Sequence, residues 1–146
     1  MLHYPPRTVL VPIDFSDLSF EALDTALRMV GTPERLHLVH VTPPIIPPGP
    51  GVAWSTVDDQ TRVAHIAEAM HKELDDRGMQ AAGVHVVVGA PAYEIAKKAA
   101  MLKVDLVVLS SHGRTGFSRF ALGSVAERLV RLCTCPVLVL KQDFGG

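Results

Sequence analysis

Short apolar runs along this chain alternate with longer segments in which apolar residues recur every three or four positions. The runs are typical of buried strands, and the longer periodicity is typical of amphipathic helices. Five strands are predicted, at residues 8–13, 35–41, 83–89, 104–109 and 136–140. A helical segment follows each of the first four strands, so strands and helices alternate along the chain.

The predicted helices carry recognisable end signals. Ser16 suits the N-cap of the first helix, and Gly31 suits its end. Gly78 ends the second helix, and Pro91 suits the first turn of the third. The apolar stripes are, in chain order, Phe20, Leu23, Leu27 and Val30; Val63, Ile66, Met70 and Leu74; Ile95, Ala96, Ala99 and Leu102; and Val125, Leu129 and Leu132.

Alternating elements with largely apolar strands predict an α/β fold, a single doubly wound domain whose five-stranded parallel sheet carries helices on both faces. The proline-rich segment 42–51 is predicted to be an extended connection, because proline fixes φ and removes a donor. That segment is too short for a domain linker, so we expect one domain over residues 1–146. In such sheets, ligands bind at the carboxyl ends of strands, where the strand order reverses.

The last strand, Val137–Leu140, is apolar and close to the chain end, which predicts an edge strand. A bare apolar edge invites pairing with another chain, and we favour a homodimer joined there. Shielding by Gln142, Asp143 and Phe144 is the alternative.

Composition and charge narrow the function classes. A net charge of −1 gives no electrostatic footprint for nucleic acid or an anionic membrane. No apolar run approaches the roughly 20 residues of a membrane span, and the first residues lack a signal-peptide core. We therefore expect a cytoplasmic protein without nucleic-acid or membrane partners.

Cys133 and Cys135 are separated by one residue in apolar surroundings. Metal binding or redox chemistry at a Cys-x-Cys pair normally needs further ligands or a different spacing. Two reduced thiols that fill space near a helix end are therefore the favoured interpretation. The histidines show no metal-ligand spacing, so no metal site is predicted.

The segment after the fourth predicted strand is the strongest functional signal. It reads Ser-Ser-His-Gly-Arg-Thr-Gly from Ser110, and Gly123 and Ser124 follow where the last helix is predicted to begin. Glycines let the backbone approach a phosphate, and the free N–H groups of the next helix point at it. Gly113 and Gly123 thus predict an anion site, with plain turn glycines as the alternative. Arg114 either contacts phosphate or is a solvated loop charge.

Several of these residues have purely local alternatives. Asp14, after the first strand, either faces a ribose hydroxyl or metal-bound phosphate, or only forms a turn before the first helix. Ser124 and Glu127 fit a capping box. For His112, a loop-shaping hydrogen bond is favoured over a general base, because no nucleophile–acid arrangement is visible beside it.

Together these residues resemble the universal stress protein (UspA-like) family along nearly the whole chain. The parallels are Val-Pro-Ile-Asp-Phe-Ser (11–16), Leu-Val-His-Val (38–41), Gly-Ala-Pro (89–91), Asp-Leu-Val-Val (105–108), His-Gly-Arg-Thr-Gly (112–116), Gly-Ser-Val-Ala-Glu (123–127) and Cys-Pro-Val-Leu-Val (135–139). The resemblance implies an adenine-nucleotide alpha-hydrolase-like fold, usually dimeric, that binds ATP or AMP and is associated with survival under stress.

The resemblance also assigns roles by position. Pro12, Asp14 and Val41 correspond to residues around the adenosine, with Val41 bonding the base through its backbone and Asp14 on the ribose side. Asp14 is also a candidate for contact with a nucleotide-bound Mg²⁺. The phosphate contacts would be Gly113, Gly123, Ser124 and the Val125 amide.

The nucleotide-binding subset of the family carries Gly-x-x-Gly, then nine residues, then Gly-Ser/Thr, and here Ser110 replaces the first glycine. If the backbone at Ser110 needed a positive φ, serine would cost about 1 kcal/mol, which weakens binding without abolishing it.

The expected function is a dimeric stress-response sensor or regulator that binds ATP or AMP. One alternative is a nucleotide-free interaction module in which Ser110 has disabled the site. The other is a slow metal-dependent ATP hydrolase that uses Asp14. The Walker and dinucleotide-binding glycine motifs are absent from the sequence, so no catalytic residue is predicted and hydrolysis would be weak at most.

Overall fold

The computed structural model describes residues 4–44, 56–112 and 122–141. Its elements are β1 (Val9–Pro12), α1 (Asp17–Val30), the 3-10 helix η1 (Pro33–Arg35), β2 (Leu36–Thr42), α2 (Thr56–Asp76), β3 (Gly83–Val88), α3 (Pro91–Leu102), β4 (Leu106–Ser110), α4 (Ser124–Leu132) and β5 (Val137–Leu140). The five predicted strands and four predicted helices are therefore confirmed, with ends that differ by one or two residues.

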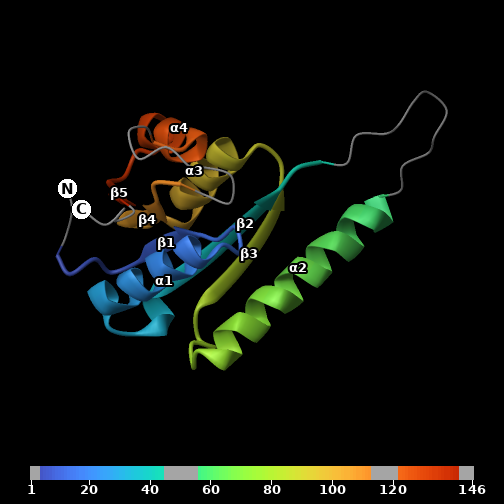
Figure 1. Cartoon of the computed structure of the whole chain (residues 1–146), viewed down its shortest axis with the longest axis horizontal. Helices are drawn as coiled ribbons and strands as arrows, with labels where there is room; N and C mark the ends of the chain where they lie inside the picture. The colour runs from blue at the N-terminus through green and yellow to red at the C-terminus, as the bar shows by residue number, and fades with distance from the viewer. Residues whose placement is uncertain (1–3, 45–55, 113–121, 142–146) are drawn as a thin grey trace.

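The strands form one parallel sheet in the order β3-β2-β1-β4-β5. The chain runs from β1 outward to β3, then crosses to the other side of β1 and continues to β5 (Figure 1). The strand order therefore reverses between β1 and β4, where such sheets bind ligands. The prediction that β5 lies at an edge is also confirmed.

Helices cover both faces of the sheet. The side chains of Val9 and Val11 belong to the core beneath α1 and α2, whereas Leu10, between them, belongs to the core beneath α3 and α4. All three are fully buried. Successive strand side chains point to opposite faces, so an apolar run without polar alternation is what a sheet covered twice requires.

The ends of α1 follow the sequence signals. The Ser16 hydroxyl accepts a hydrogen bond from the Ser19 amide at 3.1 Å, and Gly31 closes the helix with a φ of 81°. The Gly31 amide donates to the Leu27 carbonyl at 2.8 Å. Glycine adopts this left-handed conformation without steric cost, so both predicted caps are confirmed.

The start of β4 differs from the prediction. Val104 and Asp105 precede the strand, which begins at Leu106. The Asp105 carboxylate accepts hydrogen bonds from the amides of Arg7 and Thr8 at 2.8 and 3.1 Å, and its own amide donates to the Thr8 carbonyl at 2.9 Å. This side chain ties the segment before β1 to β4, a pairing between distant residues that no local pattern encodes.

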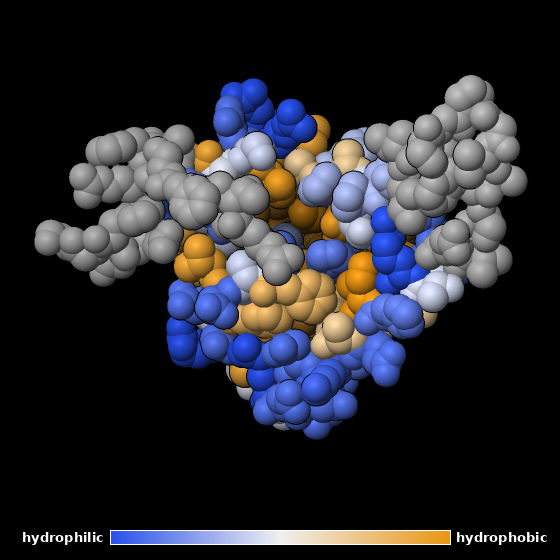
Figure 2. Space-filling model, turned by 45° about the vertical axis from the view of Figure 1, so that its right-hand side comes forward, coloured by the Kyte–Doolittle hydropathy of each residue, from blue (hydrophilic) through white to orange (hydrophobic). Residues whose placement is uncertain are grey.

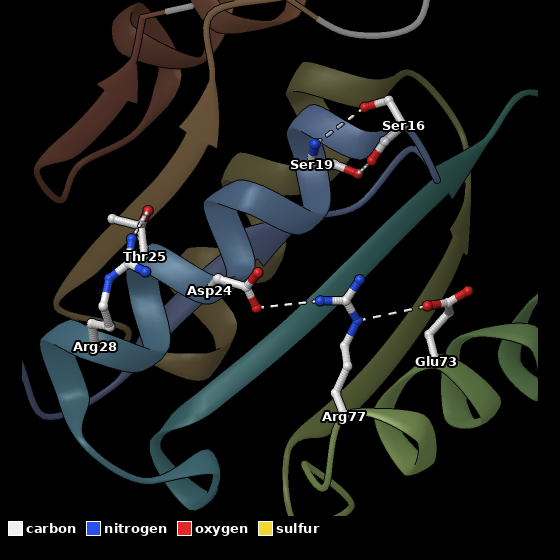
Figure 3. A network of polar contacts seen from close by, with 7 residues as sticks. All are labelled: Ser16, Ser19, Asp24, Thr25, Arg28, Glu73 and Arg77. Carbon is white, nitrogen blue, oxygen red and sulfur yellow. Dashed lines mark hydrogen bonds and ion pairs between the residues drawn. The ribbon is translucent and has the colours of Figure 1, made fainter.

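The long helix α2 lies beside β3 and runs roughly opposite to it, and its N-terminal part extends beyond the end of the strands (Figure 1). Its C-terminal end is joined to α1 by Arg77, whose guanidinium lies 3.2 Å from Asp24 and 3.6 Å from Glu73 (Figure 3). The same guanidinium lies 4.6 Å from the centre of the Phe20 ring. No helix in the described part of the chain has the length and apolar character of a membrane span.

His37 and His40 in β2 point to opposite faces of the sheet. The His37 Nδ1 atom lies 3.0 Å from Nε2 of His85 in β3, on the α3 side. Desolvation lowers the pKa of both His37 and His85, and the nearby Lys98 lowers that of His85 further. The pair is therefore held in its neutral, hydrogen-bonded form at neutral pH.

Candidate functional site

The ends of β2, β1 and β4 lie side by side, because β1 pairs with both of the others. Pro12 ends β1, Val41 is the penultimate residue of β2 and Ser110 ends β4. Asp14 follows β1 by two residues. The structure thus brings these four sequence-nominated residues to one edge of the sheet. In Figure 1, β2 runs toward the right-hand side of the molecule. Figure 2 brings this side forward and shows apolar residues in the middle of the face, bordered by hydrophilic residues.

The backbone of Val41 points past the end of β1. Pairing between β1 and β2 ends at Pro12 and Val39, and the Ile13 amide adds one more bond to the Val39 carbonyl at 2.8 Å. Backbone groups alternate in direction along a strand, so those of Val41 share the direction of Val39 and those of Thr42 face β3. The Gly89 amide accordingly donates to the Thr42 carbonyl at 3.0 Å.

Asp14 forms a tight turn before α1. Its Oδ1 atom accepts hydrogen bonds from the amide of Ser16, at 3.0 Å, and from the Ser16 hydroxyl. This is the turn role that the sequence left open beside the ligand role. The two roles are compatible, because a carboxylate has about four acceptor positions on two oxygens.

Phe15, directly after Asp14, has a φ of 64°. A left-handed conformation costs a residue with a Cβ about 1–2 kcal/mol, so contacts must hold it. The Phe15 ring packs against His40 and Phe20, with centroid distances of 5.2 and 6.2 Å. Neither Phe15 nor His40 is among the residues that the sequence nominates for the site.

The end of β4 is shaped by local hydrogen bonds. The Ser110 hydroxyl donates to the His112 carbonyl at 2.8 Å, and the Ser111 hydroxyl lies 3.1 Å from His112 Nδ1. Ser111 and His112 are both buried. The loop-shaping bond expected for His112 is confirmed. Ser110 belongs to β4 and is not among the described residues with positive φ, so no left-handed strain arises there.

Gly123 brings the start of α4 against the end of β4. Its amide donates to the Ser111 carbonyl at 2.6 Å. A Cβ on Gly123 would lie 2.7 Å from that same carbonyl oxygen, closer than real side chains approach. Gly123 is therefore required for a close backbone approach, although its φ of −60° is open to any residue.

The capping box, the local alternative for Ser124 and Glu127, is not formed. The N-cap is Gly123, and Ser124 is the first helical residue. Glu127 instead pairs with Arg131 at 3.0 Å, one turn later in the helix. The close approach of Gly123 to Ser111 sets where the helix begins. The first amides of α4, including those of Ser124 and Val125, are thus available to an anion.

Gly113 and Arg114 lie outside the described residues. Two hollows lie near the described parts of the candidate site, one at the end of β4 and one between α3 and α4. One, of about 510 Å³, is lined by Leu18, Glu21, Thr25, Ser110, Ser111, Leu140 and Lys141. The other, of about 220 Å³, is lined by Ala90, Pro91, Ala92, Tyr93, Ser124, Val125, Arg128 and Leu132. Pro12, Asp14 and Val41 line neither hollow, so volume alone does not locate the predicted adenosine site.

Cys133 and Cys135 are both free thiols packed against the core beneath α3 and α4. Burial raises the pKa of Cys133 to about 12, and it also raises the pKa of Cys135. Both thiols therefore stay protonated at neutral pH, which agrees with the space-filling role that the sequence favoured. Among the described residues, no three His, Cys, Asp or Glu side chains are placed to hold a metal ion together.

Comparison with known proteins identifies relatives of the chain. A family model described as the universal stress protein family matches residues 6–141. A universal stress protein of Methanocaldococcus jannaschii is 32% identical over 144 residues, with 93% of this chain and 82% of the relative covered.

Two solved structures share the fold. A universal stress protein in complex with cAMP has a TM-score of 0.67 at 23% identity, covering 95% of this chain and 99% of that one. A universal stress protein family protein of Arabidopsis thaliana with AMP bound has a TM-score of 0.56 at 19% identity, covering 95% and 94%.

Proposed function

The chain belongs to the universal stress protein family, and from that premise we propose that it binds an adenine nucleotide, ATP or AMP, at the carboxyl edge of its sheet. The observation that carries the proposal is the meeting of three strand ends and the α4 N-terminus at the point where the strand order reverses. Two proteins of the same fold, solved with cAMP and with AMP, support an adenine nucleotide as the ligand.

The phosphates would lie at the start of α4. The bond between Gly123 and Ser111 holds the first turn of α4 against the end of β4, and Ser124 and Val125 line a hollow there. Backbone N–H groups at a helix N-terminus bind phosphate through hydrogen bonds and the helix dipole. Ser124 and Val125 would supply these amides, and Gly113 and Arg114 would complete the site from the preceding segment.

The adenosine would lie between β1 and β2. The outward backbone groups of Val41, beyond Pro12, suit the donor–acceptor edge of a base. The Asp14 carboxylate suits a ribose hydroxyl as its acceptor, or a Mg²⁺ ion carried by the nucleotide. We propose a cytoplasmic sensor or regulator of the stress response, with nucleotide hydrolysis weak at most.

The binding test is direct. Nucleotide released on denaturing the purified protein is identified by chromatography, and ATP, AMP and cAMP are titrated calorimetrically. We expect adenine nucleotide to be recovered or to bind at micromolar concentration, and Asp14→Asn to weaken AMP binding about tenfold or more, the loss of one charged hydrogen bond. Asp17→Asn, which removes the same charge from an exposed position three residues away, is the matched control.

An empty protein that gives no heat with any of these ligands would contradict the proposal. It would favour the nucleotide-free interaction module instead. Metal-dependent phosphate release from ATP that Asp14→Asn abolishes would favour the slow hydrolase.

We also propose a homodimer joined through β5. The amides of Val107 and Ser111 donate to the carbonyls of Pro136 and Leu140 at 3.0 and 2.8 Å. The backbone carbonyls of Pro136 and Leu140 therefore face β4. The backbone groups of Val137 and Val139 therefore face the open edge. An apolar edge strand with outward donors and acceptors is suited to pairing with a second copy of itself.

Val139→Pro is expected to convert the dimer to a monomer, because proline removes the outward amide without removing a bond to β4. Light scattering after size-exclusion chromatography measures the change. Val139→Thr keeps the amide and the branched shape, and should remain dimeric. A wild-type protein that is monomeric, or a proline variant that stays dimeric, would exclude this interface.

A further inference from the structure

Ile13, the residue before Asp14, is hydrogen-bonded to β2 through both its amide and its carbonyl. The Ile13 amide donates to the Val39 carbonyl at 2.8 Å, as an extension of the sheet. The Ile13 carbonyl is 2.7 Å from Nδ1 of His40. A carbonyl only accepts hydrogen bonds, so Nδ1 of His40 carries the proton and donates. The His40 side chain donates where a backbone amide of β2 would donate if the pairing of β1 with β2 continued.

The residue after Asp14 is held by the same histidine. Phe15 has a left-handed backbone with a φ of 64°, and its ring lies 5.2 Å from the His40 ring. A strained φ of this kind persists only where the surroundings over-determine it. His40 therefore contacts both neighbours of Asp14, through a hydrogen bond on one side and ring packing on the other.

The orientation of the Asp14 carboxylate depends on this short segment. Its Oδ1 atom accepts the Ser16 amide at 3.0 Å, which requires the chain to turn sharply at Phe15. If Phe15 relaxed to an ordinary φ, the turn would open and the carboxylate would lose the bonds from Ser16 that help to direct it. The direction of the Asp14 carboxylate therefore depends, through this turn, on the position of His40.

We propose that His40 is a positioning residue for Asp14. It fixes the direction of the Asp14 carboxylate at the end of β1, so that this carboxylate faces the ribose hydroxyls of the bound nucleotide. The use of the carboxylate for ribose rests on the proposed function; the fixing of the carboxylate does not. Preorganisation of this kind raises affinity because the loop does not have to be ordered when the ligand binds.

Two substitutions of His40 separate the hydrogen bond from the rest of the side chain. Asparagine places an amide nitrogen close to the position of Nδ1 and keeps the donor, whereas leucine fills similar space without one. His65→Leu makes the same chemical change at an exposed position of α2 and is the matched control.

The first readout needs no ligand. Amide exchange of Ser16, measured by NMR in the free protein, should be about tenfold faster in His40→Leu than in the wild type, since its bond to Asp14 is released. The Gly31 amide, bonded to Leu27 at the far end of α1, should be unchanged. His40→Asn and His65→Leu should behave as the wild type. Unchanged Ser16 exchange in His40→Leu would overturn the proposal.

The second readout is ribose discrimination. The wild type and His40→Asn should bind AMP about tenfold more tightly than 2′,3′-dideoxy-AMP, and His40→Leu should bind the two equally, because a carboxylate that the turn no longer directs does not select the hydroxyls. A purely structural role would weaken both ligands alike, and full discrimination in His40→Leu would overturn the positioning role. If the wild type binds neither ligand, the proposed function fails, and the exchange result still decides whether His40 fixes Asp14.

Discussion

Replacing Gly123 with valine is expected to weaken nucleotide binding roughly 100-fold and to destabilise the protein by about 1–3 kcal/mol. A Cβ at this position would lie 2.7 Å from the Ser111 carbonyl oxygen, which is backbone and has little freedom to move. The start of α4 must then move away from β4, and its amides move with it. Losing two charge-assisted hydrogen bonds of about 1.5 kcal/mol each corresponds to roughly 100-fold in affinity. Calorimetric titration with AMP and thermal unfolding measure the two effects.

The control separates lost stability from lost binding. Gly31→Ala places a Cβ in a left-handed position where nothing lies within 4 Å, so it should cost about 1 kcal/mol through strain alone. Its affinity for AMP should equal that of the wild type. Wild-type affinity in a folded Gly123→Val protein would show that α4 does not bind the phosphates. From the sequence alone, valine would be expected only to block the path of the phosphates; the contact with Ser111 adds the structural cost.

Leu74→Ala is expected to lower the free energy of unfolding by about 2–5 kcal/mol, the usual cost of deleting a buried leucine side chain. Leu74 is fully buried and Met70 is 1% exposed, and both belong to the core beneath α1 and α2. Urea denaturation measures the loss. Faster amide exchange along α2 would show that the helix detaches before the rest of the domain unfolds.

Ile66→Ala, two turns earlier in α2, is the matched comparison. Ile66 is only partly buried, so its truncation should cost clearly less than that of Leu74. Equal losses at the two positions would contradict the view that α2 is attached mainly through its C-terminal half.

The stripe along α2 illustrates how far periodicity reaches. Spacing predicted one apolar face of four residues, and the structure buries only Met70 and Leu74 of that face completely. Periodicity states which side of a helix faces the core, but not where the sheet beneath it ends. α2 extends beyond the sheet, so its first turns have less to pack against (Figure 1).

In the candidate site, too, the sequence predicted some features and the tertiary structure decided others. Strand ends and the glycine-containing segment nominated Asp14, Val41, Ser110 and Gly123, and the fold places all four at its carboxyl edge. The capping box failed because a local motif competed with a contact between distant residues, the approach of Gly123 to Ser111. Phe15 and His40 were missed because a left-handed φ and a bond across 27 residues leave no local signature.

The sequence by itself determined the element order, the parallel sheet covered on both faces and the family of this protein. These follow from apolar periodicity, caps and turn residues, which act between neighbours along the chain. Only the tertiary structure decided how much of α2 is buried, where α4 begins and how the turn at Asp14 is held. Each depends on contacts between residues far apart in sequence, such as His40 with Ile13 and Gly123 with Ser111, whose distances are fixed only when the whole sheet has assembled.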